Sequence, residues 1–156
     1  MWSKENEINL ITKLAKNEQT ISQLYQAYAE KFPDYQKFWA NLSSEEIEHS
    51  NWISDLNSKV NQGLISFSEE RFKIEAIETF LKYLQQRLAD IKEEKISLIN
   101  ALSIALDIEN SLIERKFFEV FESDSEGLKY TLLSLAAATE FHRTKIKKIL
   151  DEIRNK

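Results

Sequence analysis

The sequence contains no cysteine, only one proline and only two glycines. Without cysteine the chain cannot form a disulfide, a thiolate zinc site or an iron–sulfur cluster. Glycine and proline are typical of turns and loops, so their scarcity predicts long helices joined by few connections. Apolar residues (42%) and charged residues (30%) are both abundant, a mixture that is typical of amphipathic helices and not of disorder.

The charges give no sign of a nucleic-acid or membrane partner. The formal net charge is −5 and acidic and basic residues are interspersed, so no basic run marks a nucleic-acid surface. No apolar stretch is long enough to span a bilayer, and residues 1–10 lack the uninterrupted apolar segment of a signal peptide. We therefore expect a soluble cytoplasmic protein in which residues 1–156 form a single helical domain.

Apolar residues that recur at steps of three and four predict five helices. Their expected ranges are about Lys4–Lys31, Asp34–Asn61, Ser68–Glu93, Ile96–Glu122 and Glu126–Arg154. Pro33 and Gly63 lie at the two ends of the second range, where such residues commonly bound a helix. The predicted fold class is therefore all-α.

In each predicted helix the apolar residues form a stripe along one face. In four of the five helices polar residues interrupt this stripe near the middle of the helix. A buried carboxylate is costly unless it is paired or binds a metal, so four interruptions at similar depth predict one shared polar site. Glu46 and His49 are three residues apart, so both side chains project from one face of their helix. Glu18, Glu109 and His142 interrupt the stripes of three other helices.

Oxygen and nitrogen ligands without sulfur suit iron or manganese. Helical bundles that bind two such ions supply one Glu from each of two helices and a Glu-x-x-His motif from each of the other two. This chain has one Glu-x-x-His motif at Glu46 and His49, and a related Thr-x-x-His at Thr139 and His142. The pattern predicts a metal site inside the bundle.

On these residues the sequence resembles the ferritin-like superfamily, particularly the di-iron domain of rubrerythrins, over nearly the whole chain. The resemblance rests on Glu18 with Tyr25, Glu46-Ile-Glu-His49, Ala105-Leu-Asp-Ile-Glu109 and Thr139-Glu-Phe-His142. It implies a ferritin-like up-down four-helix bundle with an additional helix in the long crossover connection. It also implies a homodimer that reduces peroxide or dioxygen at a carboxylate-bridged di-iron site, with electrons from an external donor.

The resemblance also implies a role for each site residue. Glu18 would be a terminal ligand, Glu46 a bridging ligand and His49 a ligand near the first metal. Glu109 and His142 would bind the second metal. Tyr25 would donate a hydrogen bond to a ligand carboxylate, a contact of the kind that orients metal ligands.

The chain departs from the rubrerythrin pattern at two positions, because Thr139 and Leu112 stand where carboxylates are expected. Glu140 follows Thr139, but one residue turns a side chain about 100° around a helix. Three core carboxylates leave one positive charge of two divalent ions uncompensated, so we expect weakened binding near His142. A single ion is the alternative, as are manganese or zinc in place of iron.

Structural interpretations of the same residues remain open. Ser43-Ser-Glu-Glu46 also matches a capping box, which would place the start of the second helix near Ser43. The two histidines could be core imidazoles bonded to neighbours, and Glu45 and Glu48 are expected to be solvated. Trp52 lies one turn beyond His49 and could form a wall of the site. The alternative functions are non-catalytic iron binding and a metal-free bundle with a structural or interaction role.

Overall fold

The computed structural model describes residues 4–63, 65–67, 74–93, 95–115, 121–123 and 126–156. Within these residues the chain forms five α-helices, one 3-10 turn and two short strands. The elements in order are α1 (Lys4–Lys31), η1 (Pro33–Tyr35), α2 (Gln36–Asn61), β1 (Ile65–Phe67), α3 (Ile74–Glu93), α4 (Leu98–Arg115), β2 (Phe121–Ser123) and α5 (Glu126–Arg154). The predicted all-α class is therefore confirmed, with a small sheet added to it.

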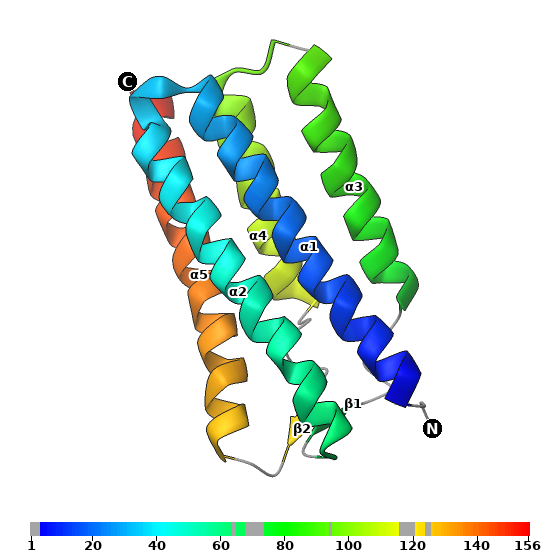
Figure 1. Cartoon of the computed structure of the whole chain (residues 1–156). Coiled ribbons are helices and arrows are strands. Elements are labelled where there is room, and N and C mark those ends of the chain that lie inside the picture. Colours follow the sequence, from blue (N-terminus) through cyan, green and yellow to red (C-terminus); the bar gives the residue numbers. More distant parts are fainter. Residues whose placement is uncertain (1–3, 64, 68–73, 94, 116–120, 124–125) are drawn as a thin grey trace.

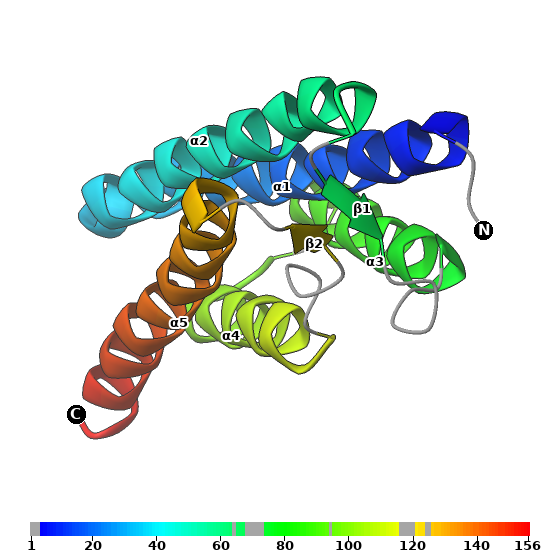
Figure 2. The ribbon, with the colours of Figure 1, turned by 90° about the horizontal axis from the view of Figure 1, so that it is seen from below.

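The helices run alternately up and down the long axis of the molecule (Figure 1). α1 and α2 form one antiparallel pair, and α4 and α5 form a second pair that lies against the first (Figure 2). β1 and α3 connect the two pairs, and α3 packs along the side of α1. Because α3 carries the chain back along the molecule, α4 runs in the same direction as α2.

The connection between α1 and α2 is a single tight turn. Pro33 fixes its own φ and has no N–H to donate, so the chain leaves the α-helix there and forms the 3-10 turn Pro33–Tyr35 before α2 begins at Gln36. The capping-box interpretation is wrong, because Ser43 lies well inside α2. Its hydroxyl donates to the Ser22 carbonyl of α1 at 2.8 Å, and the Ser22 hydroxyl donates to the Ser43 carbonyl at 2.8 Å.

The predicted limits of α1, α5 and the end of α3 agree with the structure, whereas those of α4 are wrong at both ends. Ser97 accepts a hydrogen bond from the Asn100 N–H at 3.1 Å, and Asn100 Oδ1 accepts one from the Ser97 N–H at 3.3 Å. This reciprocal cap starts the helix at Leu98, two residues later than expected. The predicted start of the third helix, Ser68, lies outside the described residues.

The last two residues of the predicted fourth helix, Phe121 and Glu122, belong to a strand, and residues 116–120 lie outside the described residues. α4 ends at Arg115, and Phe121–Ser123 forms β2, which pairs antiparallel with β1. The register places Ile65 opposite Ser123 and Phe67 opposite Phe121. Aromatic and β-branched residues suit extended chain, and the pairing links the two connections at the same end of the molecule (Figure 2).

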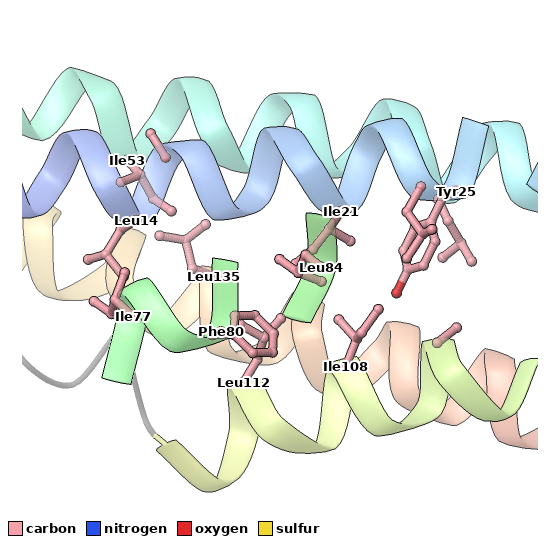
Figure 3. Close-up of a cluster of buried hydrophobic side chains, with 14 of the residues drawn as sticks. Leu14, Ile21, Tyr25, Ile53, Ile77, Phe80, Leu84, Ile108, Leu112 and Leu135 are labelled. Atoms are coloured by element: carbon pink, nitrogen blue, oxygen red, sulfur yellow. The ribbon is translucent and has the colours of Figure 1, made fainter. Parts of the chain in front are cut away.

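The apolar core extends along the whole length of the helices. α3 contributes Ile77, Phe80 and Leu84, which pack toward side chains of α1, α4 and α5 in Figure 3. Its stripe has no polar interruption, in agreement with its place outside the two helix pairs. The Lys13 ammonium of α1 also pairs with the Glu78 carboxylate of α3. Among the described residues, no helix has both the length and the apolar character needed to cross a bilayer.

The docking of α3 predicts a large cost for truncating its core side chain. We expect Leu84→Ala to lower the free energy of unfolding by about 2–5 kcal/mol, because Leu84 is fully buried and its loss leaves a cavity. Leu133→Ala is the matched control, since Leu133 of α5 is 70% exposed and its truncation should change stability by less than about 0.5 kcal/mol. Urea unfolding measures both. Equal effects would contradict the placement of α3.

Candidate metal centre

Four helices bring five acidic and histidine side chains together in the interior. Glu18 comes from α1, Glu46 and His49 from α2, Glu109 from α4 and His142 from α5. All five are buried, and the largest exposed fraction among them is 4%, at His49. The convergence of residues distant in sequence therefore occurs as expected.

The five side chains form two groups that share one carboxylate. Glu18, Glu46 and His49 make the first group, and Glu46, Glu109 and His142 make the second. In each group one potential ligand atom of every residue lies within 4.8 Å of the others. The shared residue is the one expected to bridge two ions.

The two imidazoles approach different oxygens of Glu46. His49 Nδ1 lies 3.5 Å from Oε2, and His142 Nδ1 lies 2.9 Å from Oε1. His142 Nδ1 is also 3.5 Å from Glu109 Oε1. The imidazole rings are stacked, with centroids 5.4 Å apart and planes inclined by 24°. Both rings thus present Nδ1 to Glu46, each to a different oxygen.

The carboxylates have oxygens that lack a protein donor. Oε2 of Glu18, Oε2 of Glu46 and Oε2 of Glu109 are buried and have no hydrogen-bond partner among the described residues. Leaving a buried carboxylate oxygen without a donor is expensive. A cation between these oxygens would remove that cost, so the donor set fits a metal bound by oxygen and nitrogen.

The electrostatics of the metal-free site favour proton uptake. Burial and the neighbouring Glu46 and Glu109 carboxylates raise the pKa of Glu18 well above its usual range. Burial and the charge of Glu46 raise the pKa of Glu109 to about 7, although His142 and Tyr25 partly oppose the rise. Burial alone would lower the pKa of His142, but hydrogen bonds and charge from Glu109 and Glu46 raise it to about 11.

Glu46 behaves differently from the other two carboxylates. Burial raises its pKa, but the neighbouring Glu18, His142 and His49 side chains favour its ionised form and more than offset burial, so the net pKa is lowered. A proton on Glu18 and an imidazolium at His142 therefore neutralise part of the charge of the metal-free site. Both protons must leave when a metal binds, which makes metal affinity depend on pH.

Tyr25 supports one carboxylate of the site. Its hydroxyl donates a hydrogen bond to Glu109 Oε1 at 2.9 Å, and the ring packs against Trp39 with centroids 5.6 Å apart. Burial and the charge of Glu109 raise the pKa of Tyr25, so the phenol stays protonated as a donor. This is the carboxylate contact that the sequence analysis expects of Tyr25.

Among the described side chains, no neighbouring carboxylate takes the place of those that the rubrerythrin pattern has at positions 139 and 112. Thr139 is buried, and its hydroxyl donates to the Leu135 carbonyl of the same helix at 3.0 Å. Leu112 is buried as well. The side chain of Glu140 is 56% exposed and lies 3.4 Å from Arg143, measured from Oε1 to Nη1. Among the residues whose burial is described, the core therefore contains the three glutamates expected, Glu18, Glu46 and Glu109.

Two side chains of α2 border the site from outside. The ring of Trp52 lies beside that of His49, with centroids 5.6 Å apart and planes inclined by 39°. Glu45 is not simply solvated as predicted, because its Oε2 hydrogen-bonds to Nε2 of His142. No spacing rule identifies this contact, since it depends on how α5 packs beside α2.

No protein-family model matches the chain, and no curated protein or solved structure matches it either. The assignment to the ferritin-like superfamily therefore stays a prediction, and the geometry of the site supplies the evidence for its chemistry.

The raised pKa of Glu109 makes a prediction about the metal-free protein. A carboxyl whose folded pKa is raised stabilises the fold while it is protonated, and that contribution is lost as the pH rises from about 4.5 through about 7. Glu109→Gln stays neutral at every pH. We therefore expect the stability of this variant, relative to the natural protein, to increase between about pH 5 and pH 8.

Urea unfolding with a chelator present measures this difference. Glu140→Gln is the control, because Glu140 is exposed and lies outside the two ligand groups. A Glu109→Gln difference that did not change over this range would show that Glu109 titrates as an ordinary carboxyl.

Proposed function

We propose that the chain is a ferritin-like metal protein that holds iron between its two helix pairs. The observation that carries this proposal is the pair of buried ligand groups that share Glu46 and whose carboxylates have oxygens without a donor. The two antiparallel helix pairs and the crossover through α3 also agree with a ferritin-like bundle. Manganese and zinc are the alternative ions for the same ligands.

The proposed activity is the reduction of peroxide or dioxygen. The site would hold two ferrous ions, which would supply the two electrons that, with two protons, reduce one hydrogen peroxide to two waters. The chain contains no cysteine for a second redox centre, so an external electron donor must return the ions to the ferrous state. A homodimer is part of the same proposal.

The residues of the chain prepare the site for such an ion pair. Glu18 and His49 would complete the first position, Glu109 and His142 the second, and Glu46 both. Tyr25 holds Glu109 in place through its hydrogen bond. Ile21, Ile53 and Leu135 belong to the surrounding apolar core, which keeps bulk water from the carboxylates and strengthens their charge interactions.

Metal loading tests the proposal directly. We expect the natural protein to bind ferrous iron under anaerobic conditions and to consume added peroxide. Glu46→Gln should weaken iron binding by more than the roughly 10- to 100-fold typical of a residue outside the ligand shell, because it removes the shared ligand. Elemental analysis and titration calorimetry measure the binding.

Glu48→Gln is the matched control for Glu46→Gln, because Glu48 lies on the exposed face of the same helix. It should bind iron as the natural protein does. If the natural protein takes up no metal, the bundle is a metal-free structural or interaction protein. If it binds iron but leaves peroxide unreacted, non-catalytic iron binding is the correct function.

The missing fourth carboxylate makes the second position the weaker one. Thr139 is buried on α5 one turn before His142, where a glutamate could reach the same ion. We expect Thr139→Glu to raise the affinity for the second ion roughly 10-fold or more, since it adds a charged ligand. Anaerobic iron titration measures the change. An unchanged metal content would show that position 139 does not face the site.

A further inference from the structure

His142 is held between carboxylates on both sides of its ring. Nδ1 faces inward, 2.9 Å from Glu46 Oε1 and 3.5 Å from Glu109 Oε1. Nε2 faces outward and hydrogen-bonds to Glu45 Oε2. The side chain of His142 is 1% exposed and that of Glu45 is 38% exposed, so Glu45 reaches the ring from the surface side.

Two consecutive residues of α2 make these contacts. Glu45 and Glu46 are separated by about 100° around the helix axis. The Glu46 carboxylate therefore enters the interior, whereas that of Glu45 stays at its edge. The ring of His142 from α5 lies between them. Among the other glutamates at this level, Glu48 is exposed and Glu140 is turned toward Arg143.

Carboxylates lie at both ring nitrogens, so the imidazolium of the metal-free protein can donate from each of them. An ion bound at Nδ1 would take the place of the hydrogen there. The remaining hydrogen would stay at Nε2, because the Glu45 carboxylate accepts hydrogen bonds and cannot donate them. A carboxylate behind a metal-binding histidine has this effect in many metal proteins, and it also makes the imidazole a stronger ligand.

Glu45 also adds charge where the core lacks it. Glu18, Glu46 and Glu109 carry three negative charges when ionised, one fewer than two divalent ions require. Glu45 is separated from the second ligand group by one imidazole ring. With the Glu45 carboxylate there are four nearby negative charges. A glutamate at position 139 would give the same total.

We propose that Glu45 is a positioning residue for His142, which fixes the tautomer with Nδ1 free and balances the charge of an ion bound by His142, Glu46 and Glu109. This inference rests on the proposed metal binding. Glu45 does not itself face the ion, because the imidazole lies between them. Thr139 is then compatible with two ions, since Glu45 on α2 supplies part of the missing charge.

Two substitutions separate the charge from the hydrogen bond. Glu45→Gln keeps an acceptor oxygen and removes the charge, whereas Glu45→Ala removes both. Binding is measured by anaerobic titration with ferrous iron, and the ion held by His142 is identified as the one lost in His142→Ala. We expect this ion to bind roughly 10-fold more weakly in Glu45→Gln and up to about 100-fold more weakly in Glu45→Ala. The ion at Glu18 and His49 should be unaffected.

Two further measurements exclude a merely structural role for Glu45. Thermal unfolding of the metal-free variants shows that they fold, and Glu48→Gln should bind iron like the natural protein. Adding Thr139→Glu to Glu45→Gln should restore the affinity for the ion of His142, because it returns the lost charge. A general loss of stability could not be rescued in this way.

The outcomes distinguish this inference from the proposed function. If the natural protein binds no iron, the proposed function fails and the role of Glu45 fails with it. If iron binds but Glu45→Gln and Glu45→Ala bind it as tightly as the natural protein, only the role of Glu45 is overturned. The same holds if the ion is unaffected in His142→Ala, or if Thr139→Glu fails to rescue Glu45→Gln.

Discussion

Three carboxylates in one buried space repel one another and are poorly solvated, and the rest of the site is a response to that cost. Glu18, Glu46 and Glu109 cannot all be ionised in the interior unless positive charge accompanies them. In the metal-free protein protons supply it, on Glu18 and on the imidazole of His142. Metal ions would supply it without adding hydrogens to the ligand oxygens. The same residues are therefore consistent with both states, and the pH decides how strongly protons compete with metal.

The helices must hold these groups against their mutual repulsion. The paired hydrogen bonds of Ser22 and Ser43 join α1 to α2 between side chains small enough for the backbones to approach closely. A hydrogen bond also joins α5 to α4, because Arg143 Nε donates to Asn110 Oδ1 at 2.8 Å. α3 takes no part in the site and covers the apolar side of α1. The helix pairs thus keep the ligand atoms close, and all five residues of the two ligand groups lie on helices.

Sequence periodicity could predict the helices and the residues that interrupt their stripes, because both depend on spacing within one segment. Glu46 and His49 face inward for that reason, and the bounds of α1 and α5 follow from the same pattern. The pairing of Ile65–Phe67 with Phe121–Ser123 could not be predicted, since it depends on two connections meeting at one end of the molecule. The contact of Glu45 with His142 was missed for a related reason, because helix spacing fixes the face of a residue but not its neighbour on another helix.

The contact of Glu45 with His142 changes how Thr139 is interpreted. Judged by the motif alone, a threonine in the place of the glutamate of a Glu-x-x-His motif indicates a bundle without metal. What a metal site requires is enough negative charge near the ions and correctly oriented ligand atoms, and a motif is one way of supplying them. Charge at hydrogen-bonding distance from an imidazole acts on an ion through that ring. A carboxylate on α2 in contact with His142 could supply part of the charge that Thr139 does not, so a threonine at position 139 does not by itself argue against metal binding.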